Sequence, residues 1–133
     1  MRTLLMLAAL VLASILTLVA PPLHAEPTPL EGSWSGSGTM QPVDRPTQKL
    51  TCRVNYQRET DKVFKFSAKC VTVSTAINQT GELLNVNPGV YVGEFNIASY
   101  DVSGRVRVVI ADGVQTMTFK STRASGSLTL TKS

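Results

Sequence analysis

The chain has 133 residues, with 13 Lys and Arg against 9 Asp and Glu, and its formal net charge at pH 7 is +4. The single histidine, His24, lies in an N-terminal segment that we expect to be removed. Without it, the mature chain has no imidazole for Ser-His-Asp or Cys-His catalysis or for binding a metal ion. The length suits one domain with one modest hydrophobic core.

The first 25 residues have the layout of a secretory signal peptide. Arg2 precedes an apolar run from Leu4 to Ala20, two prolines follow, and the small residue Ala25 offers a cleavage site. This order predicts cleavage after Ala25 and a periplasmic or secreted mature protein without a transmembrane segment. The alternative is an uncleaved membrane anchor, because the apolar run is near the short end of the lengths that span a bilayer.

After residue 25, the sequence consists of short runs that alternate apolar and polar residues, separated by Gly, Pro, Asn and Asp. This pattern is typical of β-strands and hairpins. The runs 49–57 and 62–70 each contain one cysteine on the apolar face. If Cys52 lies opposite Cys70, all apolar residues of both strands share one face, as a register set by burial requires. The two cysteines of an exported chain most often pair with each other, so we predict a disulfide that joins this hairpin.

Up to Cys70 the apolar residues occupy even sequence positions, and beyond it they occupy odd positions. This change predicts a bulge or bend at residues 70–72. Residues 78–81 (Asn-Gln-Thr-Gly) predict a turn, followed by a short strand over residues 83–86. Asp112-Gly113 is a strong hairpin signal, because both central residues of a type I′ turn need positive φ. That turn places Val108 opposite Met117 and Val106 opposite Phe119. Further strands are predicted at residues 90–97 and at the C-terminus.

Residues 32–133 therefore predict one all-β domain, a small antiparallel up-and-down β-barrel of about eight strands. A β-sandwich is the alternative. We expect the large inward side chains to leave little void, so that a ligand would meet the barrel mouth or the loops 41–48 and 98–103. The core-facing residues that could also contact a ligand are Tyr56, Phe66, Tyr91, Phe95, Met117 and Phe119.

Gly32-Ser33-Trp34 resembles the G-x-W motif of the calycin superfamily, the lipocalins and their relatives. In that superfamily the Trp plugs the closed end of a β-barrel and an Arg from a late strand covers its face. The resemblance implies a plug role for Trp34 and Arg123. The chain departs from the superfamily in lacking a T-D-Y motif and a C-terminal helix pattern.

A second resemblance covers most of the mature chain. Residues 32–38 (GSWSGSG), 52–56 (CRVNY) and the second cysteine are similar to small exported proteins of rhizobial and related alphaproteobacteria. This resemblance implies an envelope or secreted location and no particular activity.

The expected mature size, the single disulfide and the early Trp are also similar to small bacterial inhibitors of secreted metalloproteases. The N-terminal tail of those inhibitors enters the protease cleft. Here residues 26–31 form a Pro-rich tail that prolines make stiff and extended. The resemblance implies an inhibitory role for the tail residues Glu26, Pro27, Thr28, Pro29 and Leu30.

No pair of acidic residues is predicted on one face at a spacing suited to general acid–base catalysis. We therefore expect no enzyme, no metal site and no cofactor. Nucleic-acid binding is not expected either, because the aromatic residues lie on the core side, away from the outward basic residues. The sequence favours a monomeric, exported envelope protein of lipocalin-like type that binds a protein partner or a small apolar ligand. The alternative is a periplasmic protease inhibitor that acts through its tail.

Overall fold

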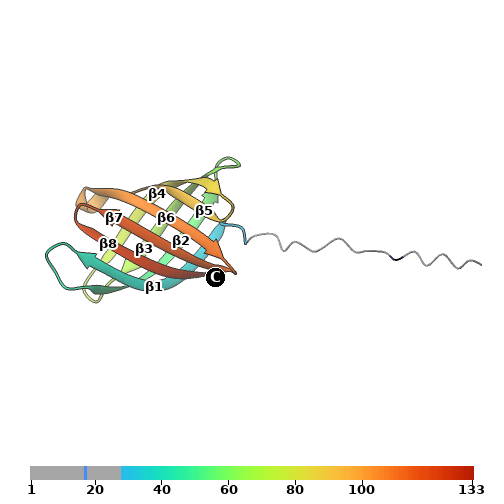
Figure 1. The fold of residues 1–133 in the computed structure, drawn as a ribbon. Helices are drawn as coiled ribbons and strands as arrows, with labels where there is room; N and C mark the ends of the chain where they lie inside the picture. The colour runs from blue at the N-terminus through green and yellow to red at the C-terminus, as the bar shows by residue number, and fades with distance from the viewer. Residues whose placement is uncertain (1–16, 18–27) are drawn as a thin grey trace, which may run out of the picture.

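The computed structural model describes residue 17 and residues 28–133. Within that part of the chain, eight strands form a closed antiparallel barrel in which each strand pairs with the next and β8 pairs with β1 (Figure 1). This confirms the up-and-down barrel over the sandwich. The elements are β1 (Gly32–Pro42), β2 (Gln48–Arg58), β3 (Val63–Val71), β4 (Ala76–Asn87), β5 (Val90–Ile97), the 3-10 helix η1 (Ala98–Tyr100), β6 (Val102–Ala111), β7 (Val114–Ser121) and β8 (Ala124–Lys132).

Period-two alternation accounts for the barrel, because every strand sends alternate side chains into one interior. Strand β2 shows it most regularly, with buried and exposed residues alternating from Leu50 to Tyr56. Closure pairs both sides of every strand and leaves no free sheet edge. Over residue 17 and residues 28–133, the structure contains no helix that could span a membrane.

Both predicted hairpin registers are confirmed. Cys52 pairs with Cys70 and the two form a disulfide, and the same ladder sets Tyr56 opposite Phe66. At the β6–β7 turn, Asp112 and Gly113 have φ values of 53° and 76°, as a type I′ turn requires. That turn also sets the predicted pairs of Val108 with Met117 and Val106 with Phe119.

The predicted turn at residues 78–81 is wrong, because β4 runs without interruption through them. The chain reverses earlier, at residues 72–75, where the Thr72 amide donates to the Thr75 carbonyl over 2.9 Å. Gly81 faces the interior under the Phe66 ring, and a Cβ there would lie 2.4 Å from a ring carbon. The glycine therefore makes room for an aromatic side chain. The turn at residues 72–75 explains why the inward residues move from even to odd sequence positions after Cys70. Val73 belongs to this turn and is 99% exposed.

The two ends of the barrel differ. Strand β1 begins and β8 ends at one end of the barrel (Figure 1), which we name the closed end. Trp34, near the start of β1, is buried there. The loop over residues 43–47 projects from the other end, which we name the open end (Figure 1). Side chains fill the closed half, whereas the open end holds a cavity.

Candidate functional site: a cavity at the open end

A cavity of about 510 Å³ opens between the β1–β2 loop, the segment around η1 and the β7–β8 turn. The expectation of a filled interior is therefore wrong for this half of the barrel. Both loops that were expected to meet a ligand, 41–48 and 98–103, contribute residues to its wall. The apolar residues of the wall include Met40, Leu50, Ile77, Phe95, Ile97, Val102 and Phe119.

Two aromatic rings lie on the inner side of the cavity. Phe95 from β5 and Phe119 from β7 meet edge to face, with their ring centroids 6.1 Å apart. Phe95 is 3% exposed, and it belongs both to the hydrophobic core and to the cavity wall. Of the six core-facing candidates, Phe95 and Phe119 line the cavity, and the other four belong to the packed interior.

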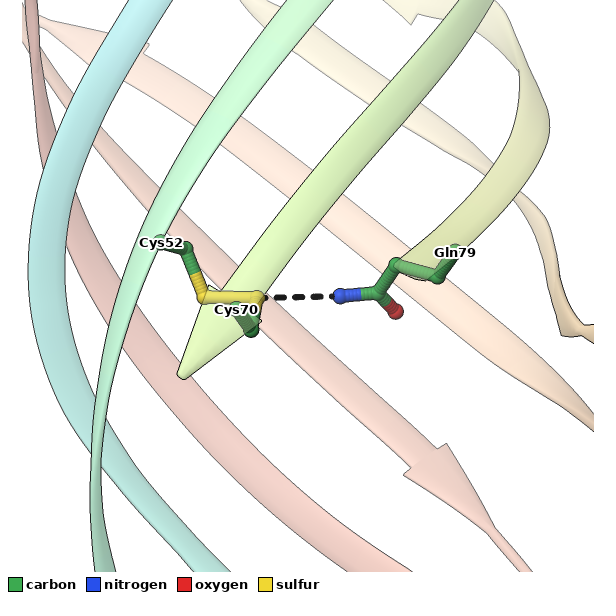
Figure 2. The surroundings of a disulfide bond; sticks show 3 residues. All are labelled: Cys52, Cys70 and Gln79. Atoms are coloured by element: carbon green, nitrogen blue, oxygen red, sulfur yellow. Dashed lines mark hydrogen bonds between the residues drawn. A yellow bond between two sulfur atoms is a disulfide. The ribbon is translucent and has the colours of Figure 1, made fainter. Parts of the chain in front are cut away.

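The disulfide forms part of the cavity wall together with a polar side chain. Cys70 and Gln79 both line the cavity, and Gln79 Nε2 donates a hydrogen bond of 3.2 Å to Cys70 Sγ (Figure 2). Figure 2 shows the amide oxygen of Gln79 pointing away from the two sulfur atoms. Gln79 therefore brings an amide group to a wall that is otherwise mainly apolar.

Charged residues lie at the rim, on neighbouring loops. Arg45 lies on the β1–β2 loop and Arg123 on the β7–β8 turn, and both line the cavity with Asp44. The two loops are joined directly, since the Val43 amide donates to the Arg123 carbonyl over 3.0 Å. These arginines give one side of the mouth a cationic character.

The role proposed for Arg123 at the barrel plug is wrong. Trp34 is buried at the closed end, and the cation near its ring is Lys132, with Nζ 5.7 Å from the ring centroid. Strand β8 runs antiparallel to β1, so its last residues meet the start of β1. Arg123 precedes β8 and therefore lies at the open end. In this pairing Trp34 lies opposite Lys132, so the register of the last strand would have identified Lys132 as the cation near Trp34.

The end of the N-terminal tail belongs to the barrel. Leu30 is 1% exposed, and its carbonyl accepts a hydrogen bond of 2.9 Å from Trp34 Nε1. Lys132 Nζ donates to the Pro29 carbonyl over 3.0 Å, and Glu31 forms an ion pair with Arg58. In the folded protein Leu30 cannot enter a protease cleft, because it fills the core. Residue Thr28 is partly buried, and Glu26 and Pro27 lie outside the described residues.

A buried polar pair at the closed end was not anticipated. Gln115 is fully buried, and its Oε1 accepts a hydrogen bond of 2.5 Å from the Tyr56 hydroxyl. Burial raises the pKa of Tyr56 far above its ordinary value, although the hydrogen bond to Gln115 acts in the opposite direction. Among the residues that the structure describes, none lies within hydrogen-bonding reach of Gln115 Nε2. The signal was present in the sequence, because Gln115 shares the alternation of the inward residues Met117 and Phe119.

No family model matches the chain. No curated protein matches it either.

Solved structures share the fold. A redesigned β-barrel, mFAP1, bound to DFHBI, has a TM-score of 0.66 and 14% identity, covering 77% of this chain and 94% of its own. Rv2717c from M. tuberculosis has a TM-score of 0.57 and 13% identity, covering 80% and 94%. The S-type phycobiliprotein lyase CPES from Guillardia theta has a TM-score of 0.52 and 8% identity, covering 78% and 88%. At these identities the likeness is one of fold.

Proposed function

We propose that this protein is a non-enzymatic binding protein that holds a small, largely apolar molecule in the cavity at the open end of the barrel. The cavity itself carries the proposal. Its volume of about 510 Å³ lies within the range of small-molecule sites, which run from roughly 300 to 1,000 Å³. Moving apolar ligand surface from water onto Phe95, Phe119 and the aliphatic wall supplies the free energy of binding.

The structural neighbours support a ligand-binding role for this type of barrel. The redesigned barrel mFAP1 is bound to DFHBI. An eight-stranded barrel has room for one small ligand where its interior is not filled by side chains. We extend this property to the present chain because its unfilled space is at the mouth, where a ligand can enter.

The absence of an enzymatic role is part of the proposal. Among the described residues that line the cavity, Asp44 is the one carboxylate. General acid–base catalysis commonly uses two groups with separated pKa values, and the wall offers no second carboxylate or histidine.

We also place the protein outside the cytoplasm, in the periplasm or secreted. A stable disulfide is typical of oxidising compartments, and residues 1–25 have the order of a signal peptide.

The test uses N-phenyl-1-naphthylamine, an uncharged apolar probe whose fluorescence rises in an apolar environment. We expect saturable binding of one probe molecule per chain. Val102→Trp places an indole in the cavity and should weaken binding by about tenfold or more, because the probe loses its apolar contacts. Val114→Trp is the matched control, since Val114 lies on the outer surface of β7 and is 39% exposed. Absence of saturable binding to the wild-type protein, or equal binding by the Val102→Trp variant, would contradict the proposal.

A further inference from the structure

Two arginines stand together at the mouth of the apolar cavity. Arg45 and Arg123 are distant in sequence, but β1 lies between β2 and β8, so the loops that carry them are neighbours. The hydrogen bond from the Val43 amide to the Arg123 carbonyl links these loops at 3.0 Å. The fold therefore places both arginines on neighbouring loops at the mouth of the cavity.

The positive charge at this place is not neutralised by an ion pair. In the described part of the chain, neither Arg45 nor Arg123 has a carboxylate oxygen within 4.0 Å, whereas Arg58 is paired with Glu31. Asp44 lines the same cavity without forming an ion pair with either arginine. Two cations and one anion leave the cavity wall with an excess of positive charge.

The loop that carries Arg45 is organised by one side chain. The amide nitrogen of Gln41 donates to the carbonyls of Pro42 and Arg45, over 3.0 and 2.9 Å. The amide oxygen of Gln41 accepts a hydrogen bond from the Thr47 hydroxyl. These three contacts hold the loop backbone in place before a ligand arrives, which lowers the entropy lost on binding.

The residues that the β3–β4 turn and η1 contribute to the cavity wall are uncharged. There the hydroxyl groups of Tyr100 and Thr75 lie 3.3 Å apart, and both residues line the cavity. Deeper in the cavity lie the rings of Phe95 and Phe119. The polarity of the wall thus changes from cationic on one side of the rim to apolar inside.

We infer that the ligand is an amphiphilic anion, with an apolar body that lies against Phe95 and Phe119 and an acidic head group held at the rim by Arg45 and Arg123. This inference rests on the proposed function and specifies its ligand class. Guanidinium groups bind carboxylate, sulfonate or phosphate oxygens through paired hydrogen bonds, whereas an uncharged head group would gain little from them. Both arginines are exposed, so the attraction is moderate and is weakened by salt.

The experiment compares two probes that share the phenylnaphthylamine body. N-phenyl-1-naphthylamine is uncharged, and 1-anilinonaphthalene-8-sulfonate carries one sulfonate. Both are titrated into wild-type protein, into Arg45→Gln/Arg123→Gln and into Arg53→Gln/Arg107→Gln. The last variant removes the same charge from exposed outward positions on β2 and β6. Near-ultraviolet circular dichroism verifies that each variant keeps its packed core, because the sulfonate probe also binds partly folded states.

We expect Arg45→Gln/Arg123→Gln to weaken sulfonate binding by about tenfold and to leave binding of the uncharged probe unchanged. The control variant should bind both probes like the wild-type protein. Added NaCl should weaken binding of the sulfonate probe to the wild-type protein and have little effect on the uncharged probe.

Other results overturn the inference in identifiable ways. If the uncharged probe binds and the sulfonate probe does not, or if the rim variant weakens both probes equally, the ligand class is wrong and the proposed function stands. If the control variant weakens sulfonate binding as much as the rim variant, the effect is one of net charge and the rim site is refuted. If neither probe binds to the wild-type protein, the proposed function is wrong, and the inference about the ligand class falls with it.

Discussion

The indole nitrogen of Trp34 donates a hydrogen bond to the main-chain carbonyl of Leu30, 2.9 Å away inside the barrel. Both side chains are buried, although Leu30 precedes the first strand. Lys132, at the end of the last strand, holds the same segment through the Pro29 carbonyl. The two ends of the domain therefore close this end of the barrel together.

Leu30→Ala should lower the free energy of unfolding by about 2–4 kcal/mol, because it removes buried methyl groups and leaves a cavity. Leu84→Ala is the matched control and should cost about 1 kcal/mol or less, since Leu84 is 46% exposed on the outer face of β4. Urea unfolding followed by Trp34 fluorescence measures both. Equal effects of the two substitutions would show that the segment before β1 is not part of the core.

Replacement of both cysteines by alanine should lower the free energy of unfolding by about 3 kcal/mol, because the unfolded chain loses the loop constraint between Cys52 and Cys70. Urea denaturation of the oxidised wild type and the double variant gives the difference. A thiol assay on denatured, non-reduced wild-type protein should detect no free thiol. Detection of free thiols would contradict the disulfide directly.

Tyr56 and Gln115 should be energetically coupled. Tyr56→Phe alone leaves the buried Gln115 Oε1 without a donor and should cost about 1–3 kcal/mol. Gln115→Met alone should leave the Tyr56 hydroxyl unpaired but cost less, because it also removes the buried Nε2 that lacks a hydrogen-bond partner among the described residues. The double variant removes both polar groups and should lose clearly less than the sum of the single variants. Strictly additive losses in urea unfolding would show that the hydrogen bond contributes nothing.

Burial raises the pKa of Tyr56 well above its ordinary value of 10.0. Below pH 10 this tyrosine is neutral in both folded and unfolded chains, so it gives no pH dependence there. Above pH 10 the unfolded chain loses the proton more readily, and stability should fall as pH rises. Unfolding measured between neutral pH and strongly alkaline pH should show this loss, and Tyr56→Phe should reduce its steepness. An unchanged slope in that variant would contradict the assignment.

Local alternation was sufficient to predict much of the fold. Cys52 and Cys70 fall on the apolar faces of consecutive strands, and one register satisfies both the disulfide and the burial of Tyr56 and Phe66. A shift by one residue would turn every apolar side chain outward, so the registers offset by one residue were excluded by sequence. The turn at Asp112-Gly113 was predictable for a similar reason, since its backbone conformation favours these residue types.

Other features depended on contacts between strands that are distant along the chain. The sequence determined most strands, two hairpin registers and the disulfide, because alternation and turn residues act between positions that are close along the chain. It misplaced the start of β4, which runs through the predicted turn at residues 78–81. Only the closed barrel decided that Gly81 accommodates Phe66, that Lys132 and not Arg123 lies near Trp34, and that Leu30 is buried. Closure also decided where space remains, because a cavity is the volume that side chains from all strands fail to fill together.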